Sequence, residues 1–173
     1  MPRARIRHAI GRPGFVVADC GQPPTAPASV DHGRFADVND PAVAILLEAG
    51  QHWATSTLDA SFAACLEALR VTGLADAGDI APHMPDLDRP AQKLVEVTDA
   101  VTVRNDGFRF EREFLGLEII EKKGTVIAMD GDEPVTTPYD HCVLVMPSKR
   151  LQPGLTAVRL GRLVEPGEFK ACG

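Results

Sequence analysis

A segment rich in turn-forming and acidic residues, from Gly73 to Pro90, divides the chain into two parts of different character. Glycine, proline and aspartate recur so often within it that neither the helical nor the strand periodicity of apolar residues continues through it. A length of 173 residues allows one domain or two small ones. We therefore expect two parts, residues 1–75 and 94–173, joined by a linker rich in proline and aspartate over residues 76–93.

The first part has the pattern of an α/β fold. An apolar run over residues 14–18 ends at Asp19, and a second run, from Ala42 to Leu47, ends at Glu48. Pro41 and Gly50 bound the second run, which predicts a strand buried on both faces, as in a parallel or mixed sheet. The long segment between the two runs, Gln22 to Asn39, is predicted to be a loop over the strand ends, where loops are often functional.

Residues 55–72 have the clearest helical pattern in the chain. Ser56 and Asp59 resemble a capping box at its start, and Gly73 is a typical residue after a helix end. Apolar side chains recur at helical spacing within this range, at Leu58, Phe62, Cys65, Leu66 and Leu69. The first part therefore has one main helix.

The second part is predicted to be all-β, in the form of a small sandwich or barrel. Short runs of β-branched and apolar residues alternate with turn signals such as those over 105–107, 122–124 and 130–132. The expected strands are Leu94–Thr98, Ala100–Arg104, Leu117–Glu121, Thr125–Met129, Cys142–Met146 and Thr156–Leu160.

Glu48 is the first candidate for a catalytic residue. Ligands of open α/β sheets bind beyond the carboxyl ends of the strands, so a carboxylate at the end of a buried strand lies where chemistry is usually done. The alternative is that Glu48 is simply the first solvated residue after the strand. The local pattern alone leaves both interpretations open.

Composition excludes several classes of protein. The chain has 24 acidic and 18 basic residues and no lysine-rich stripe, a composition that does not favour binding to nucleic acid. No apolar run is long enough to span a membrane, and the basic N-terminus lacks the apolar core of a signal peptide. The four cysteines are far apart in sequence, and this pattern is typical of reduced thiols in a cytoplasmic protein.

Several motifs with a known chemistry are also absent from the sequence. It contains no dinucleotide-binding glycine motif, P-loop or nucleophile elbow. Its five histidines have none of the short spacings that metal ligands show, so no complete zinc site can be assigned. We therefore expect this chain alone to bind zinc weakly or not at all.

Two groups of residues, in the same order, resemble the succinylglutamate desuccinylase/aspartoacylase family of zinc-dependent amidohydrolases. The first group comprises Leu47–Trp53 and Leu69–Gly73. The second comprises Asp130–Asp132, Thr137–Asp140, Cys142–Ser148 and Pro153–Gly161. The resemblance extends from about Arg5 to about Leu163 and concerns the downstream half of such enzymes. It implies the last part of a carboxypeptidase-like α/β catalytic domain followed by a C-terminal β-domain.

The resemblance also implies a reaction, the hydrolysis of the amide bond of an N-acyl amino acid or a related small acylated amine. Glu48 matches the carboxylate that acts as general base on water and then protonates the leaving amine, a role suited to a carboxylate beside bound zinc. The family's zinc ligands, an H-x-x-E motif and a later histidine, are expected upstream of this chain. An alternative is a non-catalytic binding or structural protein built on a truncated, degenerate copy of the scaffold.

Three further residues are candidates for substrate binding: Arg34, His52 and Tyr139. An arginine upstream of the glutamate could hold a substrate carboxylate in a bidentate manner, although a solvated loop arginine is the simpler interpretation of Arg34. His52 follows Glu48 closely, and Tyr139 lies on a predicted turn of the β-domain.

An uncovered apolar surface is a further expectation. The strands of the first part are predicted to be buried on both faces, so without the upstream half they would expose apolar residues. We expect self-association of the chain, or pairing with that upstream half, centred on residues 15–18 and 42–47.

Overall fold

The structure is a computed structural model that describes residues 10–19, 33–35, 37, 40, 42, 44–51 and 53–168. The chain divides into two compact units. The helical unit holds the described residues of 1–16 and 23–93, and the β unit holds those of 17–22 and 94–172. The predicted assignment of the two parts as catalytic domain and β-domain remains a prediction.

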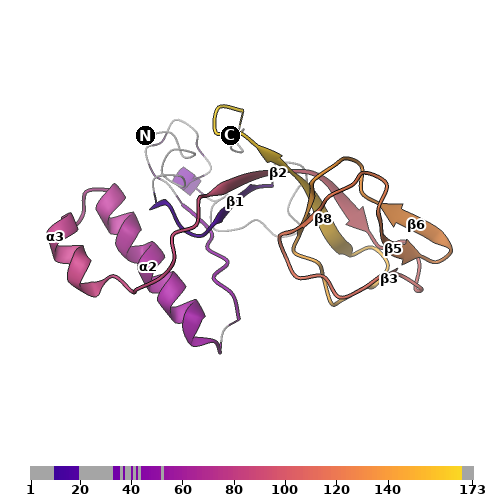
Figure 1. Cartoon of the computed structure of the whole chain (residues 1–173), viewed down its shortest axis with the longest axis horizontal. Coiled ribbons are helices and arrows are strands. Elements are labelled where there is room, and N and C mark those ends of the chain that lie inside the picture. The colour runs from indigo at the N-terminus through magenta and orange to yellow at the C-terminus, as the bar shows by residue number, and fades with distance from the viewer. Residues whose placement is uncertain are drawn as a thin grey trace. The chain divides into compact units, whose positions relative to one another are not determined.

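The β unit is built on two sheets (Figure 1). The larger sheet has the strand order β1-β2-β8-β7-β4, and its β2-β8, β8-β7 and β7-β4 pairs are antiparallel. The smaller sheet is antiparallel and has the order β3-β5-β6. The strands are β1 (Phe15–Ala18), β2 (Lys93–Thr102), β3 (Arg109–Phe110), β4 (Glu118–Ile120), β5 (Val126–Asp130), β6 (Glu133–Thr136), β7 (Cys142–Val145) and β8 (Thr156–Val164).

Both sheets contribute to one apolar core. Ile127 of β5 packs with side chains of β7 and β8, and the cluster comprises Ile127, Cys142, Leu144, Val158 and Leu160. Each of these residues is at least 97% buried, which stabilises the unit through loss of apolar surface from water. The all-β character predicted for residues 94–173 is confirmed over the described part, 94–168.

The predicted strands agree with the observed ones except at three places. Two predicted strands, 94–98 and 100–104, form the single strand β2, whose pairing with β8 shifts register between Val97 and Asp99. The prediction missed β3, which has only two residues, and β6, which contains Pro134. Proline disfavours a strand assignment, but β6 is an edge strand, where a missing backbone donor is tolerated.

The turn between β5 and β6 confirms one sequence signal. The two strands pair as far as Asp130 and Glu133, so Gly131 and Asp132 form a two-residue loop. Gly131 has a φ angle of +66°, a left-handed conformation that glycine adopts without steric cost.

The helical unit contains one long helix, α2 (Thr55–Val71), as predicted. Two short helices follow, α3 (Ala77–Ile80) and η3 (Ala81–His83), and α3 contacts α2 (Figure 1). The predicted capping box is wrong, because the N-cap residue is Ala54 and Ser56 already lies in the first turn. The hydroxyl of Thr57 instead donates a hydrogen bond of 2.7 Å to the carbonyl of Gln51.

The predicted strand from Ala42 to Leu47 is also wrong. Residues 44–49 have no regular secondary structure, and Ile45 and Leu46 are 41% and 63% exposed. A strand buried on both faces needs a neighbouring strand and a covering layer on each face. The described residues of the helical unit supply neither, because β1 lies in the sheet of β2 and β8. The first part was predicted to hold a parallel or mixed sheet, and of its two expected strands only β1 is observed, as an edge strand of the larger sheet.

The predicted loop from Gln22 to Asn39 lies largely outside the described residues. Its described residues include the short 3-10 helix η2 (Gly33–Phe35). Among the helices that the structure describes, none combines the length and the apolar character needed to cross a membrane.

Candidate functional site

Glu48 lies on the irregular segment that precedes α2, and its side chain is exposed. The expectation that Glu48 lies at the end of a buried strand is wrong, because residues 44–49 form no strand. The sequence resemblance is therefore the remaining ground for a catalytic role, which stays a prediction.

The chain just after Glu48 is nevertheless fixed to the start of α2. Gly50 has a φ angle of +120°, and a Cβ atom there would lie 3.0 Å from Oγ1 of Thr57. The carbonyl of Gln51 accepts hydrogen bonds from the hydroxyl of Thr57 and, at 3.0 Å, from the backbone N–H of Ala54. Glu48 therefore lies two residues before a turn at Gly50 whose backbone conformation favours glycine. The hydrogen bond from Thr57 connects this turn to α2.

Arg34 forms an ion pair with Asp40. Nε and Nη2 of Arg34 lie 3.2 and 3.0 Å from the same oxygen, Oδ1 of Asp40, which also accepts the backbone N–H of Ala42 at 2.7 Å. The Arg34 side chain is 63% exposed, so the pair contributes little stability but does occupy one edge of the guanidinium. The structure thus pairs Arg34 with Asp40 rather than with Glu48.

Tyr139 lies in the β unit and packs against its core. Its hydroxyl is 2.6 Å from Oγ1 of Thr98, and the guanidinium of Arg162 lies 4.8 Å from the ring centroid. Burial raises the pKa of Tyr139 and also that of the neighbouring Cys142 thiol, so both groups stay neutral near pH 7. His52 lies outside the described residues.

A buried carboxylate that the sequence analysis did not single out lies on α2. Glu67 is 2% exposed and accepts a 2.7 Å hydrogen bond from Nε of Arg70 and another from Nη2 of Arg89. The i,i+3 spacing of Glu67 and Arg70 could have indicated the first contact. Arg89 is 22 residues from Glu67, and no sequence pattern signals that second contact.

This ion triad borders a cavity of about 280 Å³. Its other lining residues are apolar: Ala77, Ile80, Ala81 and Met84. Arg12 lies close enough to Arg89 that the pKa of Arg12 is lowered, first by burial and then by the second positive charge. Arg12 also donates to the carbonyls of Leu87 and Asp88, so Arg12 and Arg89 both connect the 87–89 segment to other residues of the helical unit.

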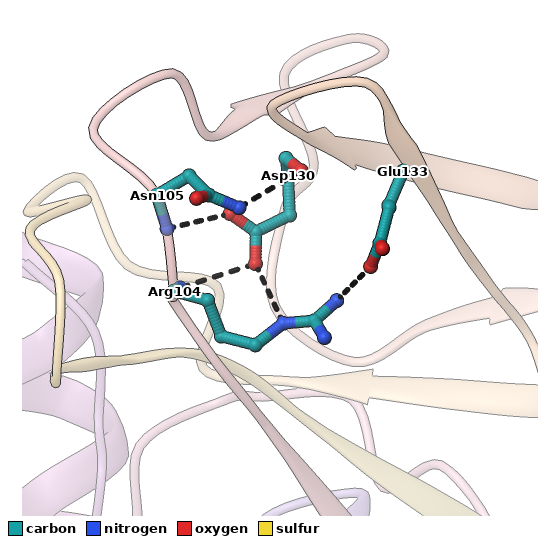
Figure 2. A network of polar contacts seen from close by, with 4 residues as sticks. All are labelled: Arg104, Asn105, Asp130 and Glu133. Atoms are coloured by element: carbon teal, nitrogen blue, oxygen red, sulfur yellow. Dashed lines mark hydrogen bonds and ion pairs between the residues drawn. The ribbon is translucent and has the colours of Figure 1, made fainter.

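A second polar network joins two loops of the β unit (Figure 2). The carboxylate of Asp130 accepts the backbone N–H groups of Arg104 and Asn105, at 3.1 and 2.9 Å, and Nε of Arg104 at 3.2 Å. Nη2 of Arg104 also reaches Glu133 at 2.7 Å. Burial raises the pKa of Asp130, but the hydrogen bonds from Asn105 and Arg104 outweigh burial, and the net pKa is lowered.

The Asp130 network borders a cavity of about 380 Å³. The carboxylate of Asp130 already accepts three hydrogen bonds, so it holds the loop after β2 rather than offering an acid or base. The walls of the cavity are largely small or apolar residues of β2 and β6, such as Val101, Pro134 and Val135. The sequence predicted the turn at 130–132 but not this network.

The described residues do not form a metal centre. No three histidine, cysteine, aspartate or glutamate side chains within the described ranges gather closely enough to hold a metal ion.

Comparisons with known proteins give a fold but no family. No protein-family model matches the chain, and no curated protein matches it significantly. The structure resembles the succinylglutamate desuccinylase of Vibrio parahaemolyticus with a TM-score of 0.51 and 17% sequence identity, over 88% of this chain and 42% of that enzyme. For the enzyme of Vibrio cholerae the TM-score is 0.40 and the identity 21%, over 57% of this chain and 29% of that one.

The first of these similarities is close enough to compare folds, and it agrees with the resemblance found in the sequence. The chain spans about two fifths of the length of the Vibrio parahaemolyticus enzyme. This chain is thus similar in fold to part of a succinylglutamate desuccinylase.

Proposed function

We propose that this chain is part of a deacylase that hydrolyses the amide bond of an N-acyl amino acid or a related small acylated amine. The observation that carries the proposal is the fold similarity to succinylglutamate desuccinylase over 88% of the chain. The family resemblance around Glu48 supports it. The acyl group and the amine remain open within this substrate class.

Glu48 is proposed as the group that moves the proton. Amide hydrolysis needs a base to take a proton from the attacking water and an acid to deliver one to the leaving nitrogen. A single carboxylate does both in turn if it is held in place, and the Gly50 turn and its anchor at Thr57 supply such a support. Zinc belongs to the proposal through the resemblance alone, with ligands outside the described residues.

Arg34, His52 and Tyr139 are proposed substrate contacts. For Arg34 the structure defines what binding would involve, since a substrate carboxylate would have to compete with Asp40 for the edge formed by Nε and Nη2. The exposed position of Arg34 makes such an exchange accessible. A cytoplasmic setting is also part of the proposal, because Cys65 and Cys142 are both unpaired.

The decisive experiment is Glu48→Gln in the natural full-length protein. The assay measures release of free amine from a panel of N-acyl amino acids, beginning with N-succinylglutamate, with zinc supplied. Glutamine keeps the shape of the side chain but cannot accept and return a proton, so kcat should fall about 100-fold or more. Bound zinc, measured by metal analysis, should not change.

Glu168→Gln is the matched control, because Glu168 is an exposed glutamate of the β unit. It should leave turnover unchanged. An active protein in which Glu48→Gln has no effect would contradict the catalytic assignment.

A second candidate function is a non-catalytic binding or structural protein on the same scaffold. One observation favours it: Glu48 is exposed and lies on an irregular segment rather than at the end of a strand. Lack of hydrolysis of every acylated amine tested, together with loss of zinc on dialysis of the full-length protein, would select this alternative.

A further inference from the structure

Two strand edges of the β unit border the same cavity. β6 is the last strand of the smaller sheet, so one of its edges has no neighbour among the described strands. β2 has ten residues and its neighbour β1 has four. The two strands begin together, because the backbone N–H of Lys93 donates to the carbonyl of Gly14 at 2.9 Å, so β1 reaches only the first half of β2.

The second half of β2 and the edge of β6 line the cavity of about 380 Å³. We call this cavity the β2–β6 groove. A strand edge with unpaired backbone N–H and C=O groups is a template for pairing with another chain. Two such edges along one groove would be an accessible place for a further strand.

The hydrogen-bond pattern of β2 shows which N–H groups point toward the groove. Val103 donates its N–H to the carbonyl of Leu155, just before β8, at 2.9 Å. Successive N–H groups of a strand alternate between its two edges, so those of residues 100, 102 and 104 point away from β8. Ala100, Thr102 and Arg104 all line the β2–β6 groove.

Carboxylates accept two of these three N–H groups. Oδ1 of Asp99 accepts the N–H of Ala100 at 2.8 Å, and Oδ2 of Asp130 accepts that of Arg104 at 3.1 Å (Figure 2). Asp130 is 1% exposed and also accepts the N–H of Asn105, so its position is fixed. Each carboxylate takes the place of a carbonyl that a neighbouring strand would supply.

The opposite wall of the groove lacks a donor because of proline. Asp130 and Glu133 pair across the two-residue loop, and Pro134 and Met129 are the next pair. Hydrogen-bonded and non-hydrogen-bonded pairs alternate, so the backbone nitrogen of Pro134 lies on the outer edge of β6. Proline has no N–H, and a proline on an edge strand prevents further pairing there.

We propose that Asp99, Asp130 and Pro134 protect the β2–β6 groove from strand addition and so prevent two copies of this protein from joining through it. Thr102 then supplies the one N–H of the three that no described group accepts. A paired strand needs a hydrogen bond at every second residue, so a single donor is too few.

This surface differs from the one that the sequence indicated for self-association. That expectation centred on residues 15–18 and 42–47. Val16 and Ala18 are buried, whereas Ile45 and Leu46 are 41% and 63% exposed. Association through residues 42–47 would involve the helical unit and would not depend on Asp99 or Pro134.

The first test removes two of the three protecting residues together. Asp99→Ala frees the N–H of Ala100, and Pro134→Thr adds an N–H to the edge of β6. Both residues are exposed, so the fold should tolerate the changes. Sedimentation velocity should show association at a concentration about tenfold lower than for the wild type, because two donors become available.

The matched control combines Asp106→Ala with Pro138→Thr. Asp106 and Pro138 are exposed residues of the β unit that lie outside its strands. The control removes the same charge and the same proline ring, and it should behave as the wild type.

A second pair of variants separates the hydrogen bond from the charge. Asp99→Asn keeps an oxygen that can accept the N–H of Ala100 but removes the negative charge. Combined with Pro134→Thr, it should associate less readily than Asp99→Ala with Pro134→Thr. Equal association of the two would overturn the role of the Asp99 hydrogen bond.

Amide hydrogen exchange locates the new interface. In the associated Asp99→Ala, Pro134→Thr protein, the amides of Ala100 and Thr102 should exchange more slowly than in dilute solution, because a paired strand gives them acceptors. The amide of Leu144, in the core, should exchange as in the wild type if the fold is intact. Unchanged molar mass, equal association of the control, or association without protection of residues 100 and 102 would overturn the proposal.

Discussion

The two units of this protein differ in what they bury. The β unit buries large apolar side chains almost completely, among them Ile127, Leu144 and Val158. In the described part of the helical unit, the largest side chain that is buried to this degree is a charged one, Glu67. The exposed large apolar residues show the reverse distribution. Among the residues that the structure describes there are twelve, and eight of them belong to the helical unit: Phe35, Ile45, Leu46, Trp53, Leu58, Phe62, Leu69 and Leu74.

The difference shows that apolar residues form a core only where a second layer covers them. In the β unit, the sheet of β3, β5 and β6 and the sheet of β2, β8, β7 and β4 cover each other. In the helical unit, α3 and the 84–90 segment contact only one side of α2. Leu58, Phe62 and Leu69 of α2 therefore remain exposed in the described part of the chain.

Within the described part of the chain, each unit buries one carboxylate that arginine contacts: Glu67 in the helical unit and Asp130 in the β unit. Asp130 is held by backbone N–H groups and Arg104 within a unit that has a large core. Glu67 joins α2 to the 84–90 segment through Arg70 and Arg89, in a unit with little apolar burial. Removal of each interaction tests how much its unit depends on it.

The largest expected effect concerns the core of the β unit. Leu144→Ala removes a fully buried side chain and should lower the free energy of unfolding by about 2–5 kcal/mol. Leu115→Ala, in the same unit but 72% exposed, should change it by less than about 0.5 kcal/mol. Urea unfolding at a fixed protein concentration measures both. Similar losses in the two variants would break the comparison, because the β unit would then not have a tightly packed core.

A smaller effect is expected at Glu67. Glu67→Gln removes the charge that both arginines share and should destabilise the helical unit by about 1–3 kcal/mol. The partly exposed arginines can turn to water, which keeps the loss below that of a fully buried ion pair. Circular dichroism at 222 nm follows this unit, because every helix that the structure describes belongs to it.

Asp79→Asn is the control for this measurement, since Asp79 is exposed on α3 in the same unit. It should leave the helical transition where it is in the wild type. If Glu67→Gln also had no effect, the helical unit would owe its stability to something other than the triad.

The smallest effect is a dependence on pH at Asp130. The pKa of Asp130 is lower in the folded protein than its unfolded value of 3.8. At pH values above 3.8, the ionised carboxylate therefore stabilises the β unit. This stabilisation is lost as the pH falls through the lower pKa of the folded state. The decrease in stability of the wild type below about pH 4 should be smaller in Asp130→Asn. Asp132→Asn, an exposed neighbour, should show the same decrease as the wild type.

Acid unfolding curves recorded at several pH values compare these variants. If Asp130→Asn lost as much stability at low pH as the wild type, other carboxylates would be responsible for that loss.

Most of the secondary structure could be predicted from the sequence, because it depends on local signals. The range predicted for α2, 55–72, differs from the observed helix by one residue, and the turn at Gly131 lies where glycine and aspartate indicated it. The failure to predict strand β6 has a local reason as well. Pro134 lies in this strand, and proline is unfavourable in any strand except at the edge of a sheet. The position of β6 at the edge is not encoded locally.

The candidate site was less predictable. Residue type and resemblance indicate Arg34, Tyr139 and Glu48 as candidates. The structure shows contacts for two of them: Arg34 contacts Asp40, and Tyr139 contacts Thr98 and Arg162. Glu48 was expected at the end of a strand, and that expectation failed. The local pattern does not reveal whether neighbouring strands are present.

The sequence by itself determined where α2 and the main strands of the β unit lie, and which of their side chains are apolar. Only the tertiary structure decided which of those side chains are covered: those of β5, β7 and β8 are buried, while Leu58, Phe62 and Leu69 remain exposed. It also decided that residues 44–47 form no strand. The physical reason is that periodicity is a property of one segment, whereas burial needs a second layer of the molecule, or a second molecule, to remove the segment from water.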